Sequence, residues 1–224
     1  MYGLGRAALV LLVVAMLAIA GWIALSRWHP ATDKYPVQGV DVDEATGAIE
    51  WPVVAAGGAD FAYAVATHGS MQRDRRFEEN WAGSAAAGMR RGAVHVWSLC
   101  QLAVDQANAF NTTVPQDAAA LPAAIDIAYE DGCAARPDRK VLAGELARAA
   151  AMIEAHTGKP VLLRITKPVE RDYDLMSALP RTLWATGNFF PPDYASRPWR
   201  MWRASDMRRI DGVEGTVNWN VAAP

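Results

Sequence analysis

The sequence has little cysteine, little histidine and little charge, and several familiar kinds of site have no motif in it. Two of its 224 residues are cysteine, four are histidine, and 21% are charged. No spacing of these residues matches the usual zinc sites, and no G-x-S-x-G stretch marks a serine nucleophile. The net charge is −2, without a basic stripe among aromatic residues. The sequence therefore predicts no metal, no cofactor and no nucleic acid partner.

The first thirty residues form a long stretch with almost no charge. Residues 7–26 contain none, and about twenty apolar residues are enough to cross the core of a bilayer. Trp22, Arg27 and Trp28 suit the membrane interface at its far end. The alternative is a cleaved signal peptide with Ala18-Ile19-Ala20 as its small-x-small cleavage site. In either case we expect the remaining chain to be exported.

This pattern divides the chain into three parts. Residues 1–28 are the anchor or signal peptide, residues 29–36 a polar linker with two prolines, and residues 37–224 one globular domain. If the anchor is kept, the domain lies on the periplasmic side of the inner membrane. If it is cleaved, the domain is secreted.

The two cysteines each follow a predicted strand, so they could lie at the same end of a sheet. Cys100 and Cys133 are an even count in an exported domain, which favours a disulfide. Two free buried thiols are the alternative.

Strand and helix patterns alternate along the domain. Short apolar runs typical of buried strands cover residues 37–43, 61–67, 92–99, 123–128, 161–166, 182–186 and 200–204. Helical patterns cover residues 76–88, 101–112 and 137–157. This alternation predicts an α/β fold with a parallel barrel or layered sheet. In such folds the chemistry lies at the carboxyl ends of the strands.

Two aspartates interrupt otherwise apolar strands. Asp41 stands in GVDVD and Asp126 in AAIDIA, and a buried carboxylate is costly unless it is paired or used. One alternative is a structural hydrogen bond to a neighbouring loop or to His95, which could itself be a neutral core residue. Two such aspartates on different strands of one barrel favour a functional site.

With these residues in view, residues 37–222 resemble the glycoside hydrolase family 25 lysozymes. The stretches that carry the resemblance are GVDVD (39–43), FAYAVATHG (61–69), DRRFEEN (74–80), GAVHVWS (92–98), LPAAIDIA (121–128), PWRMWRA (198–204) and GVEGTVNWN (212–220). Their order and spacing agree with the family pattern over the whole exported part.

The resemblance implies a fold and a substrate. The family's fold is an irregular TIM-like barrel, expected here with about five strands and three helices after the N-terminal hydrophobic helix. Its members are muramidases that cut peptidoglycan between N-acetylmuramic acid and N-acetylglucosamine. The implied partners are therefore a peptidoglycan glycan strand and, through the N-terminal helix, the inner membrane.

The resemblance also places the catalytic groups, and here the chain departs from the family. Asp41 and Asp126 match the family's aspartates, but the glutamate of its D-x-E pair, usually regarded as the general acid, falls on Ala128. Other groove positions differ as well: the family's serine, glutamate, tyrosine, glutamine and aspartate are replaced by Asp43, His68, Val94, Arg203 and Asn218.

Two other acids could replace the missing glutamate. Residues two apart on a strand share a face and lie roughly 6.6 Å apart, so Glu130 is the next acid beyond Ala128 and Asp43 the neighbour of Asp41. Glycosidase carboxyl pairs work at about 5–9.5 Å. The alternatives are a solvated loop for Glu130 and a surface position for Asp43. The residues expected to bind substrate are His68, His95, Trp97, Arg203 and Asn218.

Two functions follow from this pattern. The first is a peptidoglycan hydrolase of the lysozyme kind that uses a relocated acid, Glu130 or Asp43. The second is an inactive homologue that binds peptidoglycan or a partner, because fold and family do not by themselves confer activity. A non-sugar enzyme on the same barrel has no motif in its favour.

Overall fold

Short strands that are buried on both faces form the centre of the molecule. The computed structural model describes residues 2–224, with side chains from residue 9 onward. The barrel strands are β1 (Gln38–Val42), β2 (Phe61–His68), β4 (Arg90–Val96), β5 (Ala124–Ile127), β6 (Leu162–Ile165), β7 (Thr182–Thr186), β8 (Met201–Arg208) and β9 (Val217–Ala222). The two-residue strand β3 (Gln72–Arg73) pairs antiparallel with the end of β2 and lies outside the ring.

The sheet closes into a barrel because β1 pairs with β2 on one side and with β9 on the other. Neighbouring strands run parallel from β1 through β8, whereas β9 runs antiparallel to both of its neighbours. The predicted α/β barrel is therefore confirmed as a class. In the described chain the carboxyl ends of seven parallel strands meet at one mouth.

The expected number of about five strands is wrong, because eight strands close the ring. Seven of them correspond to the apolar runs of the sequence. The eighth, β9, was missed because its sequence VNWNVA alternates asparagine with apolar residues. Its asparagines face a polar barrel interior, so the strand has no continuous apolar run.

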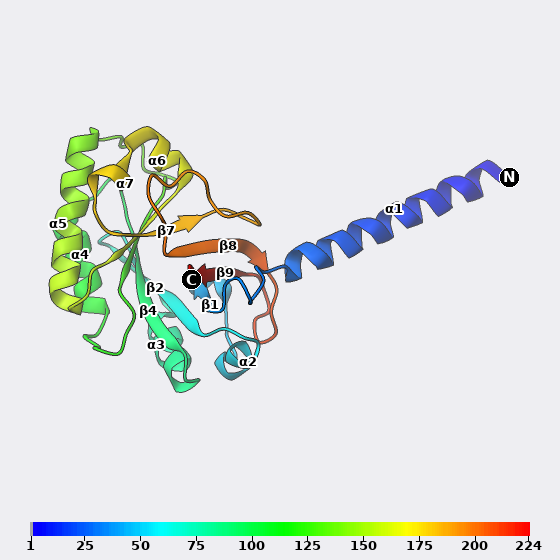
Figure 1. Cartoon of the computed structure of the whole chain (residues 1–224), viewed down its shortest axis with the longest axis horizontal. Helices are drawn as coiled ribbons and strands as arrows, with labels where there is room; N and C mark the ends of the chain where they lie inside the picture. Colours follow the sequence, from blue (N-terminus) through cyan, green and yellow to red (C-terminus); the bar gives the residue numbers. More distant parts are fainter. Residues whose placement is uncertain (1) are drawn as a thin grey trace.

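Helices cover the outside of the barrel (Figure 1). They are α2 (Trp51–Ala56), α3 (Phe77–Ala86), α4 (Ala103–Thr113), α5 (Arg139–Thr157), α6 (Lys167–Tyr173) and α7 (Leu175–Ala178), with the 3-10 turn η1 (Glu44–Thr46). The three predicted helices match α3, α4 and α5. The expected three helices are too few, because α2, α6 and α7 are too short to show a helical period.

Helix α5 shows how the sequence sets these elements. Its apolar residues recur at helical spacing, and all of Leu142, Leu146, Ala149 and Ile153 are buried against the barrel. The helix ends at Gly158, which adopts the left-handed conformation with φ of 72°.

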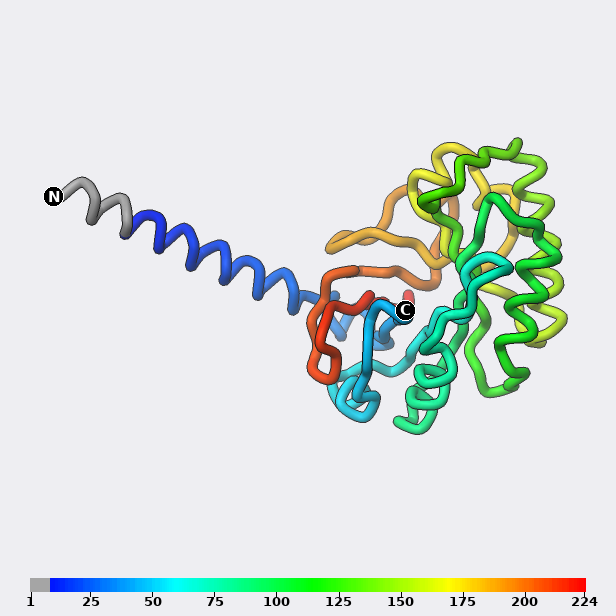
Figure 2. Tube along the Cα trace, turned by 180° about the vertical axis from the view of Figure 1, so that it is seen from behind, coloured from blue at the N-terminus to red at the C-terminus, as the bar shows by residue number. Residues whose placement is uncertain are grey.

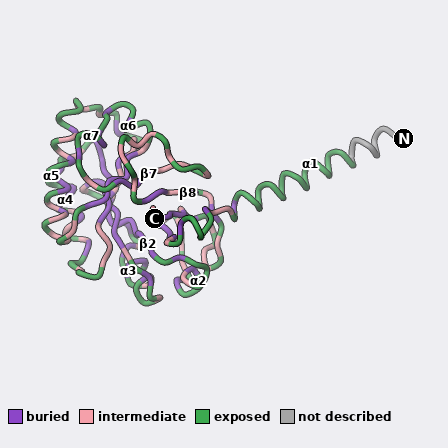
Figure 3. The backbone as a smooth tube through the Cα atoms, viewed as in Figure 1, coloured by how far each residue is buried: buried purple, intermediate pink, exposed green. Residues whose placement is uncertain are grey.

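The N-terminal helix α1 (Tyr2–Arg27) projects from the barrel as a rod (Figures 1 and 2). Over Leu9–Arg27 it is long and apolar enough to cross a membrane, and only 6% of that window is buried. In Figure 3 its described residues, from Leu9 onward, are exposed up to the end that meets the barrel, in contrast to the buried strands. A signal sequence has the same features.

The linker after α1 packs on the barrel rather than extending into solvent. Tyr35 is buried and contacts Trp202 edge to face, with ring centroids 5.8 Å apart. Gln38 of β1 donates hydrogen bonds to the carbonyl oxygens of Pro30 and Tyr35 at 2.9 Å each. The end of α1 is therefore held close to β8 and β9.

The structure contains the predicted disulfide. Cys100 follows β4 and Cys133 follows β5, two neighbouring parallel strands, and their Cα atoms lie 5.9 Å apart. The bond ties together two loops at the mouth of the barrel.

We expect loss of this disulfide to lower the stability of the protein. The bond closes a loop with a sequence separation of 33 residues, for which chain entropy gives about 3–4 kcal/mol. Urea unfolding of the double variant Cys100→Ser, Cys133→Ser should show this loss relative to the oxidised protein. The control is reductant, which should destabilise the native protein and leave the variant unchanged. Equal midpoints for oxidised and reduced native protein would contradict the expectation.

Candidate active site

Asp41 lies at the centre of the barrel and is the most heavily bonded carboxylate of the site. It stands near the end of β1 and is 2% exposed. Arg203 of β8 donates to both of its oxygens, from Nε at 3.1 Å and from Nη2 at 2.5 Å. Asn218 and Asn220 of β9 donate at 3.0 and 2.8 Å. These bonds satisfy the carboxylate and fix its orientation.

Arg164 of β6 joins Asp41 to Asp126. Its Nη1 donates to Asp41 at 3.0 Å and its Nη2 to Asp126 at 2.7 Å. The side chain is 2% exposed, and its guanidinium stacks over the ring of Trp184 at 4.5 Å from the centroid. The two aspartates predicted from the sequence are thus brought together, with an arginine between them.

The charges of this cluster balance. Burial would raise the pKa of Asp41, but the guanidinium groups of Arg203 and Arg164 outweigh it and hold that pKa below its usual value. Burial would lower the pKa of Arg164, and the carboxylates of Asp126 and Asp41 raise it instead. Asp41 is therefore an anion at neutral pH, and it cannot donate a proton.

Ala128 follows β5 two residues beyond Asp126 and carries no acid to the mouth. The next acid, Glu130, is partly buried and accepts a hydrogen bond from the Ser98 hydroxyl at 2.5 Å. Its carboxylate lies within 4.8 Å of the sulfur atoms of Cys100 and Cys133. Because those sulfurs form a disulfide, they offer no thiolate to a metal ion. Among the described residues, no hydrogen bond joins Glu130 to either aspartate.

Asp43 bonds the turn that directly follows it in the chain. Its side chain accepts hydrogen bonds from the backbone N–H groups of Ala45 and Thr46 and forms a capping box with Thr46. A capping carboxylate stabilises the start of a helical turn. The structure therefore places Asp43 at the start of η1, and no hydrogen bond to Asp41 or Asp126 is seen in the described chain.

His95 and Trp97 lie inside the protein, with exposures of 0% and 2%. His95 bonds Thr67 through Nδ1 at 2.8 Å and Gln106 through Nε2 at 3.2 Å. Burial lowers the pKa of His95 to about 4, so the imidazole is neutral at pH 7. Neither ring presents a surface to a sugar in this arrangement.

The other residues expected to bind substrate lie nearer the surface. Arg203, with a side chain 20% exposed, and the partly exposed Asn218 reach inward to Asp41. His68 ends β2 and is also partly exposed. These three residues bring polar groups to the mouth from β8, β9 and β2.

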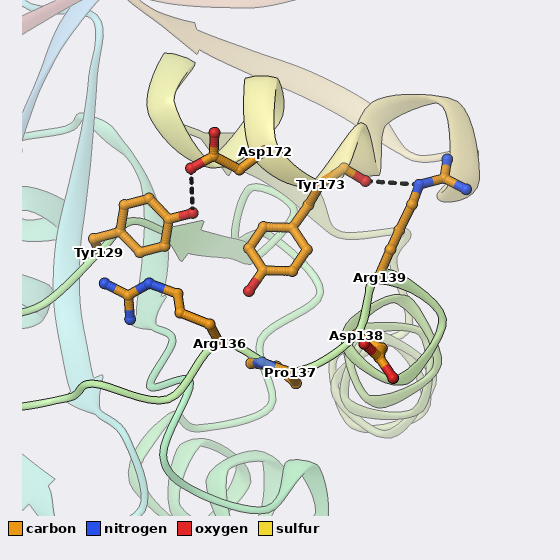
Figure 4. Close-up of a pocket in the computed structure, with 7 residues that line it drawn as sticks. All are labelled: Tyr129, Arg136, Pro137, Asp138, Arg139, Asp172 and Tyr173. Atoms are coloured by element: carbon orange, nitrogen blue, oxygen red, sulfur yellow. Dashed lines mark hydrogen bonds between the residues drawn. The ribbon is translucent and has the colours of Figure 1, made fainter.

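A pocket of about 600 Å³ lies beside the mouth, between the loop after β5 and α6 (Figure 4). Tyr129 donates a hydrogen bond to Asp172 at 2.8 Å, and Arg136 stacks over the Tyr129 ring at 4.2 Å. Neither Asp41 nor Asp126 lines this pocket. One face of the Tyr129 ring is thus covered by the Arg136 guanidinium rather than open to a ligand.

Sequence reasoning missed Arg164, Trp184 and Asn220. The indole of Trp184 donates to Asn220 at 3.0 Å, which orients the amide that bonds Asp41. Arg164 carried a signal in the sequence, because VLLRIT is a buried strand pattern with one cation in it. A buried cation requires an anionic partner, and Asp41 and Asp126 were the buried anions available.

We expect His95 to make the protein less stable in mild acid. Unfolded histidine binds a proton below about pH 6.5, whereas folded His95 stays neutral down to about pH 4. The contribution of neutral His95 to the free energy of unfolding is therefore fully present above the unfolded pKa. It is lost as the pH falls from about 6.5 toward 4. Between pH 7 and pH 5 the loss should be about 2 kcal/mol.

Urea unfolding of the native protein and of His95→Gln at these two pH values measures this effect. The variant should lose about 2 kcal/mol less than the native protein over the same interval. Asp41 contributes little there, because its lowered folded pKa and the ordinary pKa of an unfolded aspartate, about 3.9, both lie below this interval. Equal pH dependence in the two proteins would contradict the assignment of a buried neutral histidine.

Comparison with known proteins agrees with this geometry. The profile of "Glycosyl hydrolases family 25" matches residues 40–213. "Uncharacterized protein YegX" of Escherichia coli O157:H7 is 31% identical over 196 residues, which are 84% of this chain and 70% of that protein.

Solved structures show the same fold. A family 25 glycosyl hydrolase from Bacillus anthracis superposes with a TM-score of 0.78 at 30% identity, covering 87% of this chain and 92% of that one. The bacterial lysozyme from Streptomyces coelicolor gives 0.74 at 25% identity, covering 83% and 91%. On the matched profile, the relatives and the barrel, this chain belongs to glycosyl hydrolase family 25.

Proposed function

We propose that this protein is held in the inner membrane by α1 and binds the glycan strands of peptidoglycan at the mouth of its barrel without cleaving them. Membership of family 25, whose solved members include a bacterial lysozyme, supports the substrate class. The observation that carries the absence of cleavage is the pairing of Asp41 and Asp126 with one buried guanidinium, that of Arg164.

Glycoside hydrolysis needs a carboxylic acid that protonates the leaving oxygen and a carboxylate that stabilises the cationic sugar. Asp41 is ionised and fully bonded, and Asp126 accepts from Arg164. Ala128 offers only a methyl group where the family has its glutamate. Loss of a positioned general acid costs about 10²–10⁴ in rate. The cluster thus holds two carboxylates, and on this proposal it lacks a proton donor for the leaving oxygen.

The same arrangement suits binding. His68, Arg203 and Asn218 bring hydrogen-bonding groups to the mouth, and the bonds between β8, β9 and Asp41 hold two of them in place. Preorganised polar groups lose little freedom when a ligand binds. The hydroxyl and acetamido groups of a glycan can form hydrogen bonds with such polar side chains.

The anchor suits this role as well. The Ser26 carbonyl at the end of α1 accepts a hydrogen bond from the Arg209 N–H at 2.6 Å, so the helix continues directly into the packed domain. A tethered domain of this kind would stay between the membrane and the cell wall.

A second candidate function is hydrolysis with Glu130 as the proton donor. The observation in its favour is the position of Glu130, which follows β5 beyond Asp126, is partly buried and has a hydroxyl partner in Ser98. Movement of this loop would be needed to bring Glu130 to the bond that breaks.

We expect the full-length protein in detergent to sediment with insoluble peptidoglycan and to release no soluble muropeptides above the buffer level. An active lysozyme under the same conditions is the positive control. Release that disappears in Glu130→Gln and persists in the exposed-site control Glu214→Gln would establish the second function instead. Failure both to sediment and to release would overturn the peptidoglycan proposal.

A carboxyl group at residue 128 should restore part of the missing chemistry. Ala128→Glu places an acid just past the end of β5, roughly 6.6 Å along an extended chain from Asp126, within the range of working glycosidase pairs. Muropeptide release should rise by about 10², the lower end of what a general acid contributes. The matched variant Ala128→Gln has the same size without the acid and should stay at the native level. Equal release from the two variants would show that the mouth does not hold a glycan productively.

A further inference from the structure

A second polar pocket lies where α1 meets the barrel. It has a volume of about 660 Å³. The last turns of α1 form one wall, and residues 208–213, where β8 ends and the turn to β9 begins, form the other. In Figures 1 and 2, α1 joins the domain beside this turn. The residues with charged or interfacial side chains that line it are Trp22, Arg27, Arg208, Arg209 and Asp211.

Arg208 is the unusual member of this set. It is 8% exposed, and its guanidinium stacks on the ring of Trp219 at 3.6 Å from the centroid. Its Nε and Nη1 are buried and have no hydrogen-bond partner in the described part of the chain. No ion pair of Arg208 is found there either.

A buried cation without a counterion is energetically unfavourable. Burial lowers the pKa of Arg208 to about 10, so the group still carries its charge at neutral pH. Stacking on an indole compensates only part of the lost hydration. Arg27 and Arg209 add two exposed cations, and Asp211 is the only acid in the pocket lining. The pocket lining thus carries three cations and one acid, and its buried cation, Arg208, has no counterion among the described residues.

The place of the pocket identifies the kind of anion. The segment able to cross a membrane ends at Arg27, and the Arg209 N–H bonds the Ser26 carbonyl at 2.6 Å. The pocket thus lies at the end of the apolar span, at the depth of the lipid headgroups. Trp22, which is 51% exposed, is a residue typical of that interface.

We propose that this pocket binds the phosphate of an anionic glycerophospholipid headgroup, with Arg208 as its buried ligand and Arg27 and Arg209 at its rim. Such a contact would orient the barrel on the membrane surface. The inference rests on the anchoring part of the proposed function and not on peptidoglycan binding.

Thermal unfolding of the full-length protein in dodecylmaltoside tests this site. Addition of dioleoyl phosphatidylglycerol should raise the midpoint by about 5 °C at saturation, because a ligand bound only by the folded state stabilises it. Dioleoyl phosphatidylcholine and inorganic phosphate at equal concentration should raise it much less. Equal shifts with phosphatidylcholine, or with phosphate alone, would overturn the lipid site.

Variants locate the effect. Arg208→Gln should abolish the shift caused by phosphatidylglycerol, while the control Arg148→Gln, on the exposed face of α5, should keep it. If Arg208→Gln fails to fold, Arg209→Gln decides, because the backbone bond of residue 209 to Ser26 remains. The affinity of that variant for phosphatidylglycerol should fall by about fivefold. An unchanged shift in the folded variant overturns the proposal.

The anchor is checked separately. The mass of the membrane-bound protein from cells shows whether residues 1–28 are kept. If they are removed, the anchoring part of the proposed function fails even where the purified full-length protein binds phosphatidylglycerol. If they are kept and no lipid shift is seen, only the headgroup site fails.

Discussion

The buried carboxylate of Asp41 is the constraint on which the centre of this barrel depends. It lies where β1, β6, β8 and β9 converge, and an anion in that position must be neutralised and hydrogen-bonded. Arg164, Arg203, Asn218 and Asn220 meet this demand from three other strands. The asparagines of β9 face the barrel interior because Asp41 needs hydrogen-bond donors there. The strand that closes the barrel also supplies two of the donors to Asp41.

This network also limits the chemistry at the mouth. A carboxylate saturated by guanidinium and amide donors stabilises charge but releases no proton, and Asp126 shares the same arginine. The chain belongs to a glycosidase family and keeps its barrel, while residue 128, two positions beyond Asp126, is an alanine with only a methyl group. Fold membership and catalytic competence are separate properties, which is why we propose a binding role for the mouth.

The barrel class and most of its elements were predictable from the sequence, because buried strands and amphipathic helices leave local apolar patterns. The Cys100–Cys133 bond was predictable for a different reason: two cysteines in an expected exported domain allow one intramolecular pairing. The closing strand β9 and the short helices α2, α6 and α7 were not. A strand whose inward face is polar has no apolar run, and a helix of one or two turns has no measurable period.

By itself the sequence determined which chemical groups are present: two aspartates on apolar strands, an alanine at residue 128, and one apolar helix at the N-terminus. Only the tertiary structure decided which of these groups meet. Arg164 bonds Asp41 across 123 residues of chain and Asp126 across 38, and Arg208 is buried on Trp219 beside the end of α1. These contacts depend on strand register and barrel closure, which arise from pairing between distant segments and leave no local pattern in the sequence.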